Sequence, residues 1–238
     1  MQIKKHIPNT ITLLNLASGL LAVIAVFKGY YDEAFIFVCL GIFFDFWDGF
    51  LARKFKVSGE LGLQLDSLAD VVSFGVAPAT AVFILLKEFT LFPGFLSPFQ
   101  EYFPYTAFII SVFSAYRLAK FNIDDRQTTS FLGLPTPANG LFWITYVYGT
   151  HLLASSNGFY FYLTIGFILM LSLLMVSEIP MFSLKIKRLV LKGNEKQLLL
   201  IILMIAFVLF WGIIGVAWGI LAYIAISVIT MGKKKTIR

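Results

Sequence analysis

The stretch that decides the fold runs from residue 45 to residue 70 and reads DFWDGFLARKFKVSGELGLQLDSLAD. It places four aspartates, Asp45, Asp48, Asp66 and Asp70, inside two of the most apolar segments of the chain. An ionisable side chain at bilayer depth is costly and usually marks a functional site. Four carboxylates in neighbouring segments therefore demand compensating positive charge.

The rest of the sequence indicates an integral membrane protein. Of its 238 residues, 59% are hydrophobic and 13% are charged, whereas a soluble domain averages about 45–50% apolar residues. We expect an all-α, polytopic membrane helical bundle that forms a single domain over residues 1–238. Its eight expected transmembrane helices cover residues 10–28, 33–53, 62–87, 103–121, 136–153, 158–180, 197–212 and 213–231.

The first helix is expected to begin at Asn9 or Thr10. Pro8 lacks a backbone N–H and should stop any earlier helix, and Asn and Thr are favourable N-cap residues. The last two helices are expected to form a tight hairpin around WGIIG, residues 211–215.

Both termini and the aspartates are expected on the cytoplasmic side. With eight spans, every Lys and Arg among the 19 in the chain, except Lys28 and Lys87, falls on the side of the termini. The positive-inside rule assigns that side to the cytoplasm. The net charge of +6 is then explained by topology and contact with anionic lipid, and no nucleic-acid partner is expected.

The aspartates lie on single helix faces, because they recur at spacings of three and four residues. The stripe on the second helix consists of Asp45, Asp48, Gly49 and Ala52. The stripe on the third helix consists of Gly62, Asp66, Asp70 and Ser73. A short loop joins the two helices, which places the carboxylates roughly 7–14 Å below the cytoplasmic surface.

Like charges this close would repel one another unless cations lay between them. All-oxygen ligands suit Mg²⁺ or Mn²⁺, and four carboxylates are enough for two divalent ions. The small residues on the stripes leave room for a ligand to approach the backbone, and Arg53 offers a planar fork suited to phosphate. The stretch therefore predicts a metal-dependent diphosphate site at the lipid–water boundary.

Three alternative interpretations of the aspartates are less favourable. A purely structural network of ion pairs would need more cations than Arg53 alone. A cation transporter would need a path across the bilayer, whereas these carboxylates cluster at one depth. An intramembrane prenyltransferase also binds diphosphate through aspartates and Mg²⁺, but it usually carries them on two well-separated helices.

The motif resembles that of a known family. The pattern Asp45-x2-Asp48-Gly49-x2-Ala52-Arg53-x8-Gly62-x3-Asp66-x3-Asp70 matches the signature of the CDP-alcohol phosphotransferases without departure. The resemblance covers roughly residues 8–180, as a six-helix core, and leaves residues 181–238 as an additional helix pair. Members of the family transfer a phosphoalcohol group from a CDP-alcohol to a second alcohol and release CMP.

The resemblance implies roles for the residues of the motif. The four aspartates would hold two divalent ions, Mg²⁺ or Mn²⁺, on the CDP diphosphate, and Asp70 would also be the general base for the acceptor hydroxyl. The pocket for cytidine and phosphate would be lined by Gly49, Ala52, Arg53 and Gly62, with Asn9 and Thr12 from the PNTIT turn. A homodimer is expected on resemblance alone.

Further stretches resemble the phosphatidylserine synthases within this family, namely DSLADVVSFGVAPA, YRLAKFN with FLGLPTPANG, and VSEIPMFSLK. They imply that CDP-diacylglycerol and L-serine react to give phosphatidylserine and CMP. Glycerol phosphate and inositol phosphate are alternative acceptors, although either would favour more basic residues facing the pocket.

The candidate for binding the acceptor is Arg117, because an arginine fork can bind a carboxylate or a phosphate through two hydrogen bonds. The alternative is that Arg117 is an ordinary positive flank of the fourth helix. Asn139 either lines the acceptor pocket or caps the fifth helix, and the sequence leaves both alternatives open.

Overall fold

The computed structural model describes residues 2–57, 59–90, 97–124, 131–154, 158–182 and 194–235. Six basic residues expected on the cytoplasmic side lie outside these ranges, as does the end of VSEIPMFSLK; they are Arg126, Lys185, Lys187, Arg188, Lys192 and Arg238.

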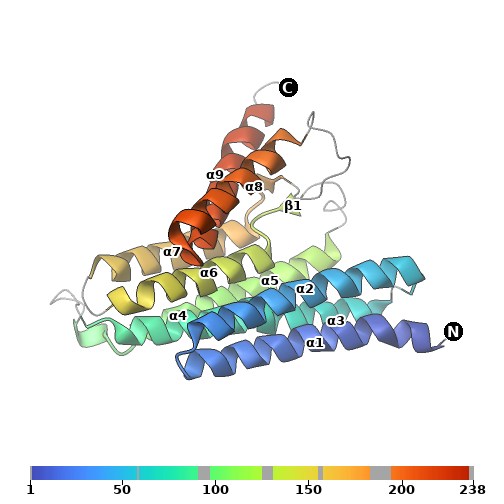
Figure 1. Cartoon of the computed structure of the whole chain (residues 1–238), viewed down its shortest axis with the longest axis horizontal. Coiled ribbons are helices and arrows are strands. Elements are labelled where there is room, and N and C mark those ends of the chain that lie inside the picture. Colours follow the sequence, from blue (N-terminus) through green and yellow to red (C-terminus); the bar gives the residue numbers. More distant parts are fainter. Residues whose placement is uncertain are drawn as a thin grey trace.

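Eight helical rods make up the described part of the chain (Figure 1). The first three are α1 (Gln2–Phe27), α2 (Tyr31–Phe55) and a continuous rod formed by α3 (Glu60–Asp70), the π-helical segment η1 (Val71–Val76) and α4 (Ala77–Glu88). The other five are α5 (Phe108–Ile123), α6 (Thr136–Thr150), α7 (Phe159–Val176), α8 (Glu195–Trp211) and α9 (Ile214–Lys235). Short 3₁₀ turns at Ser97–Phe99, Phe103–Ala107 and His151–Leu153 complete the helical structure.

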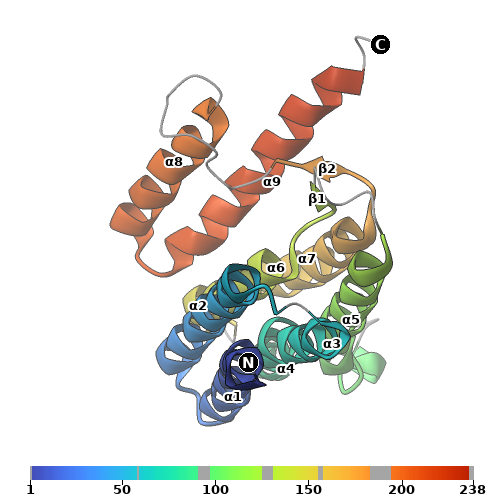
Figure 2. The ribbon, with the colours of Figure 1, turned by 90° about the vertical axis from the view of Figure 1, so that its right-hand side faces the viewer.

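The expected all-α membrane bundle is confirmed. Four helical segments of the described chain are long and apolar enough to cross a bilayer, namely His6–Phe27, Tyr31–Phe55, Glu60–Glu88 and Phe159–Val176. Large apolar side chains such as Leu21, Phe43 and Leu173 are exposed on the outside of the rods, as expected for a protein whose surroundings are lipid. Seen along the rods, α1 to α7 surround a common core (Figure 2).

The expected start of the first helix at Asn9 or Thr10 is wrong. Helix α1 begins at Gln2 and continues through Pro8. Proline removes one backbone donor and crowds the carbonyl four residues earlier, but the helix keeps its path into the span. The hydroxyl oxygen of Thr12, one turn later, lies 3.1 Å from the Pro8 carbonyl oxygen.

The π-helical segment η1 packs tightly among α1, α5 and α6. The Ser73 hydroxyl donates to the Asn15 carbonyl oxygen at 2.9 Å, which ties η1 to α1. A Cβ atom on Gly140 would lie 2.9 Å from Phe74 Cα, so glycine is required for this approach of α6. The wider turn of η1 directly follows Asp70, and π-helical turns are often found at functional sites.

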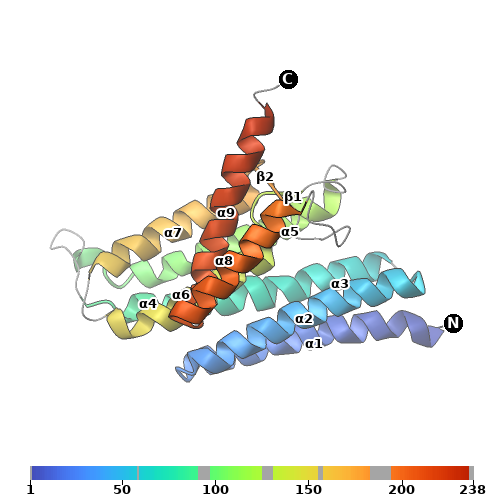
Figure 3. The ribbon, with the colours of Figure 1, turned by 45° about the horizontal axis from the view of Figure 1, so that its top comes forward.

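A small antiparallel ribbon, not anticipated from the sequence, joins two loops on the side of the chain that carries α9. Strand β1 (Phe131–Leu132) pairs with β2 (Pro180–Met181). Helices α8 and α9 form the expected hairpin, and Figure 3 shows it standing at an angle to the other rods. Helix α9 packs on α6 and on β2, whereas α8 packs mainly on α9.

Candidate functional site

The turn between α2 and α3 brings the two aspartate stripes together. Helix α2 ends at Phe55, and its C-cap residue Lys56 adopts a left-handed backbone conformation (φ 55°) and donates its N–H to the carbonyl oxygens of Ala52 and Arg53. Helix α3 starts two residues after Ser58, with the extended Gly59 at its N-cap. This short connection makes α2 and α3 antiparallel neighbours.

Three of the four aspartates form one cluster. Asp45, Asp48 and Asp66 each offer a carboxylate oxygen, and these atoms lie within 4.8 Å of one another. The Asp66 Oδ1 atom is buried and has no hydrogen-bond partner among the described residues. Three converging hard oxygens, with a buried carboxylate oxygen of Asp66 left unpartnered, are a donor set that fits a divalent cation.

Helix α1 orients one aspartate of this cluster. The Thr12 hydroxyl donates to Asp48 Oδ2 at 2.5 Å, and both residues are buried. Thr12, which the resemblance assigned to the nucleotide pocket, thus also contacts a carboxylate of the cluster.

The fourth aspartate lies outside the three-carboxylate cluster. Asp70 is only 6% exposed, and its Oδ1 accepts a hydrogen bond of 2.9 Å from Asn15 Nδ2. It remains within electrostatic range of Asp45 and Asp66. The site is thus a cluster of three carboxylates with a separate, hydrogen-bonded fourth, and not one group of four.

A cavity of about 200 Å³ adjoins the cluster. Its lining includes all six residues that the resemblance assigned to the nucleotide, namely Asn9, Thr12, Gly49, Ala52, Arg53 and Gly62. Asp48 and Asp66 also line it, together with Pro8, Val57, Gly59 and Leu63. The cavity therefore joins two carboxylates of the cluster to an arginine and a wall of small residues.

The two motif glycines leave room for polar side chains. A Cβ on Gly49 would lie 3.3 Å from Arg53 Nη1, so the guanidinium rests on the bare backbone of α2. A Cβ on Gly62 would lie 3.4 Å from Asn9 Oδ1, which is an ordinary contact distance. Gly49 thus sets the position of Arg53 more strictly than Gly62 sets that of Asn9.

Arg117 is buried inside the protein, which does not fit an exposed positive flank. It is 7% exposed, and its Nη1 donates to Thr136 Oγ1 at 3.1 Å. Its Nε has no partner among the described residues. Asp70 and Tyr223 are both within electrostatic range of the guanidinium.

Two residues of this region were missed in the sequence. Asn15 holds Asp70, and its sequence signal is a lone amide within the apolar run ITLLNLASGLL. Thr136 holds Arg117 and carries no comparable signal. For Asn139, the capping alternative is wrong, because Pro135 occupies the N-cap of α6 and no side chain caps this helix end.

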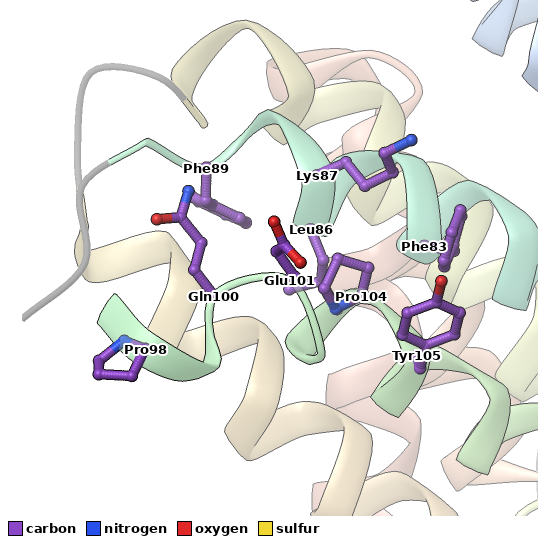
Figure 4. A pocket seen from close by; sticks show the side chains of 9 residues that line it. All are labelled: Phe83, Leu86, Lys87, Phe89, Pro98, Gln100, Glu101, Pro104 and Tyr105. Carbon is purple, nitrogen blue, oxygen red and sulfur yellow. The ribbon is translucent and has the colours of Figure 1, made fainter. Parts of the chain in front are cut away.

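A larger cavity of about 620 Å³ lies at the C-terminal end of α4, away from the aspartates (Figure 4). It is lined by Phe83, Leu86, Lys87, Phe89, Pro98, Gln100, Glu101, Pro104 and Tyr105. None of the site residues expected from the sequence belongs to this lining, so its size alone does not make it the functional site.

Comparison with known proteins agrees with the site. Residues 5–181 match the CDP-alcohol phosphatidyltransferase family. A CDP-diacylglycerol–serine O-phosphatidyltransferase of Bacillus subtilis is 35% identical over 151 residues, which cover 63% of this chain and 80% of the relative. The enzyme of the same name from Helicobacter pylori strain J99 is 29% identical over 203 residues, or 84% of this chain and 80% of the relative.

An archaeal relative carries a different name. The archaetidylserine synthase of Methanothermobacter thermautotrophicus is 32% identical over 177 residues, which cover 73% of this chain and 68% of the relative. The family model matches three quarters of the chain, and three of the four motif aspartates form one cluster. The chain belongs to the CDP-alcohol phosphatidyltransferase family.

Proposed function

We propose that this protein transfers the phosphatidyl group of CDP-diacylglycerol to L-serine, forming phosphatidylserine and CMP. The observation that carries the proposal is the cavity in which Asp48, Asp66, Arg53 and the small motif residues meet. The names of the relatives support serine as the acceptor.

Two divalent ions, Mg²⁺ or Mn²⁺, would be held by Asp45, Asp48, Asp66 and Asp70. Such ions would neutralise charge on the diphosphate oxygens and on the departing CMP. Thr12 and Asn15 support this arrangement, since each fixes one carboxylate by a hydrogen bond. Ligating carboxylates are typically oriented in this way by a second layer of hydrogen bonds.

The remaining residues bind the donor. The Arg53 guanidinium, resting on Gly49, would bind a phosphate of the CDP group through two parallel hydrogen bonds. Asn9, Ala52 and Gly62 would line the nucleotide pocket beside it.

The chemical step joins serine to the lipid phosphate. The serine hydroxyl oxygen forms a bond to the phosphorus that carries the diacylglycerol, and the bond from that phosphorus to the CMP oxygen breaks. Asp70 takes the hydroxyl proton as a general base, a role that requires hydrogen-bond reach of the reacting group. Arg117, within electrostatic range of Asp70, would bind the serine carboxylate.

The active site and both termini are proposed to face the cytoplasm. The turn between α1 and α2 lies at the end of the rods opposite the C-terminal end of α2 (Figure 1). Lys28 belongs to that turn, whereas Arg53, Lys54 and Lys56 belong to the C-terminal end of α2, so the positive-inside rule supports this orientation. In a Cys39→Ser background, the variant Lys28→Cys should react with an impermeant maleimide on intact cells, whereas Lys56→Cys should not. The reverse labelling pattern would show that the orientation is the opposite of the one proposed.

A homodimer and a single domain over residues 1–238 remain predictions.

The decisive test is a transfer assay with the purified protein in detergent. CDP-diacylglycerol, Mn²⁺ or Mg²⁺ and one acceptor at a time are supplied, while CMP release and the lipid product are followed. We expect CMP and phosphatidylserine with L-serine, and neither with glycerol phosphate or inositol phosphate. A parallel assay with CDP-archaeol tests whether the protein also accepts an ether-lipid donor, the alternative that the name of the archaeal relative suggests. Transfer to another acceptor, with none to serine, would refute the proposal.

A further inference from the structure

The start of α6 carries a buried amide that no part of the fold accounts for. Asn139 is 0% exposed, yet neither its Oδ1 nor its Nδ2 has a hydrogen-bond partner among the described residues. Buried polar atoms without a partner are rare and costly, and each one calls for an explanation. The backbone of Asn139 is already satisfied, because its N–H donates to Pro135 O at 3.0 Å.

The amide lies on the same face of α6 as the partner of Arg117. Thr136 and Asn139 are three residues apart on a helix, which places their side chains next to each other. Thr136 Oγ1 accepts from Arg117 Nη1 at 3.1 Å. The Nε atom of Arg117 is likewise buried and without a partner in the described chain. Two helices thus bring three unpartnered polar atoms into the same region.

The chemistry of these atoms indicates what they would bind. With Nη1 bound to Thr136, the Nε–Nη2 edge of the guanidinium is the one suited to a carboxylate. A carboxamide supplies both a donor and an acceptor, so it can donate to a carboxylate and accept from an ammonium. A ligand carrying both charges on one carbon satisfies all three atoms, whereas a phosphate leaves Asn139 Oδ1 unpartnered.

The C-terminal helix closes this region. The Tyr223 hydroxyl of α9 donates to Phe182 O at 3.1 Å, and its ring packs edge-on against that of Phe182 at 5.0 Å. Phe182 directly follows β2, and β2 pairs with the β1 segment that leads into α6. Tyr223 is itself within electrostatic range of Arg117.

We propose that Asn139 is a specificity-determining residue of the acceptor subsite, where its carboxamide binds the ammonium and carboxylate groups of an amino-acid acceptor beside Arg117. This inference rests on the proposed function and extends it by a recognition group on α6. The acceptor would lie with its hydroxyl toward Asp70 and its charged groups toward Arg117 and Asn139.

The test compares Asn139→Ala with Thr145→Val in the purified full-length enzyme. Thr145 is a buried residue of α6 whose hydroxyl bonds only to carbonyls of its own helix, so its replacement controls for packing. For Asn139→Ala, we expect the KM for L-serine to rise by about 10- to 100-fold, as for lost hydrogen bonds to charged groups. The KM for CDP-diacylglycerol should stay unchanged, and Thr145→Val should alter neither constant.

An acceptor analogue separates recognition from structure. The wild-type enzyme should prefer L-serine to 3-hydroxypropanoate, which lacks the ammonium group, and Asn139→Ala should reduce that preference by about 10-fold. Asn139→Leu removes the unpartnered polar atoms with little change of volume, so it should raise the Tm while abolishing the preference. A lowered Tm together with an unchanged KM for serine would show a structural amide and overturn the inference.

The outcomes also separate this inference from the function on which it rests. If the wild-type enzyme releases no CMP with L-serine, the proposed function fails. If the wild-type enzyme is active and Asn139→Ala keeps both its KM for serine and its preference within twofold, only the role of Asn139 fails.

Discussion

Asp45, Asp48 and Asp66 share one cluster, but Asp48 and Asp66 differ in their hydrogen bonding. Asp48 accepts a hydrogen bond from Thr12, whereas Asp66 leaves one buried oxygen without a partner in the described structure. Charged groups this close are destabilising unless a cation lies among them. A divalent cation, as proposed above, would balance the charge of this cluster.

Replacing one aspartate of the cluster should weaken metal binding and lower transfer activity. For Asp45→Asn, we expect transfer activity to fall by more than about 100-fold, since changes to residues that merely support a metal site already cost about 10- to 100-fold. Mn²⁺ binding, followed by electron paramagnetic resonance, should weaken in parallel. Asp32→Asn is the matched control, because Asp32 is an exposed aspartate in the first turn of the same helix. Full Mn²⁺ binding by Asp45→Asn would contradict the metal site.

The contact between Gly49 and Arg53 gives a second prediction. A methyl group on Gly49 would lie 3.3 Å from Arg53 Nη1, so Gly49→Ala should displace the guanidinium from the donor phosphate. We expect kcat/KM for CDP-diacylglycerol to fall by up to about 10-fold, because the guanidinium must shift by a few tenths of an ångström, whereas a misplacement of about 1 Å can cost about 100-fold. Gly166→Ala is the control, since a Cβ on Gly166 of α7 meets no atom within 4 Å. Equal activity of the two variants would refute the role of Gly49.

The sequence predicted some residues of the site and did not predict others. The spacing of the aspartates was informative because helical periodicity places them on one face, and the structure brings Asp45, Asp48 and Asp66 together. The partners Asn15 and Thr136 come from helices distant in sequence. No local pattern encodes such contacts, since they depend on how the helices pack.

Among the elements, the π-helical segment η1 holds the site in register with the rest of the bundle. It continues α3 directly after Asp70, bonds to α1 through Ser73, and receives α6 at Gly140. A change in the packing of η1 should therefore affect the stability of the helices that carry Asp70 and Arg117.

Gly140→Ala tests this packing. Its Cβ would lie 2.9 Å from both Cα and O of Phe74, and backbone atoms cannot move aside easily. We expect a loss of about 1–3 kcal/mol, as for other overpacked sites, seen as a lower Tm in detergent. Gly219→Ala is the control, because its Cβ would meet the flexible side chain of Met204. Similar Tm values for the two variants would show that α6 and η1 are not closely packed.

In several elements, tertiary contacts override what the local sequence predicts. Hydropathy predicted the ends of the rods to within about five residues, except for the start of α1, because length and apolar content dominate in a bilayer. It was wrong at Pro8, where the helix continues through a proline. It could not reveal η1 or the β1–β2 ribbon, since both depend on tertiary contacts.

On the scale of the whole molecule, the C-terminal helix pair is joined to the family core by buried contacts. The family match ends at residue 181, yet α9 buries Ala217, Ile220 and Tyr223. Met181 of β2 is also fully buried. The pair thus lies against the segments that surround Arg117, as an element of one domain would.

Tyr223 allows the contribution of the helix pair to be measured. Tyr223→Phe removes the hydroxyl that donates to Phe182 O and keeps the ring, so it should raise the KM for serine by about 2- to 10-fold, the range of a single neutral hydrogen bond. Tyr223→Ala also removes a buried ring, and should lower the stability by about 3–5 kcal/mol. Trp218→Ala is the control, because Trp218 of α9 is 48% exposed and should tolerate the change. Serine KM and Tm are measured for all three variants. A chain truncated after residue 182 that kept the full Tm and serine KM would show instead that α8 and α9 are dispensable, and that the acceptor region is complete within the six-helix core.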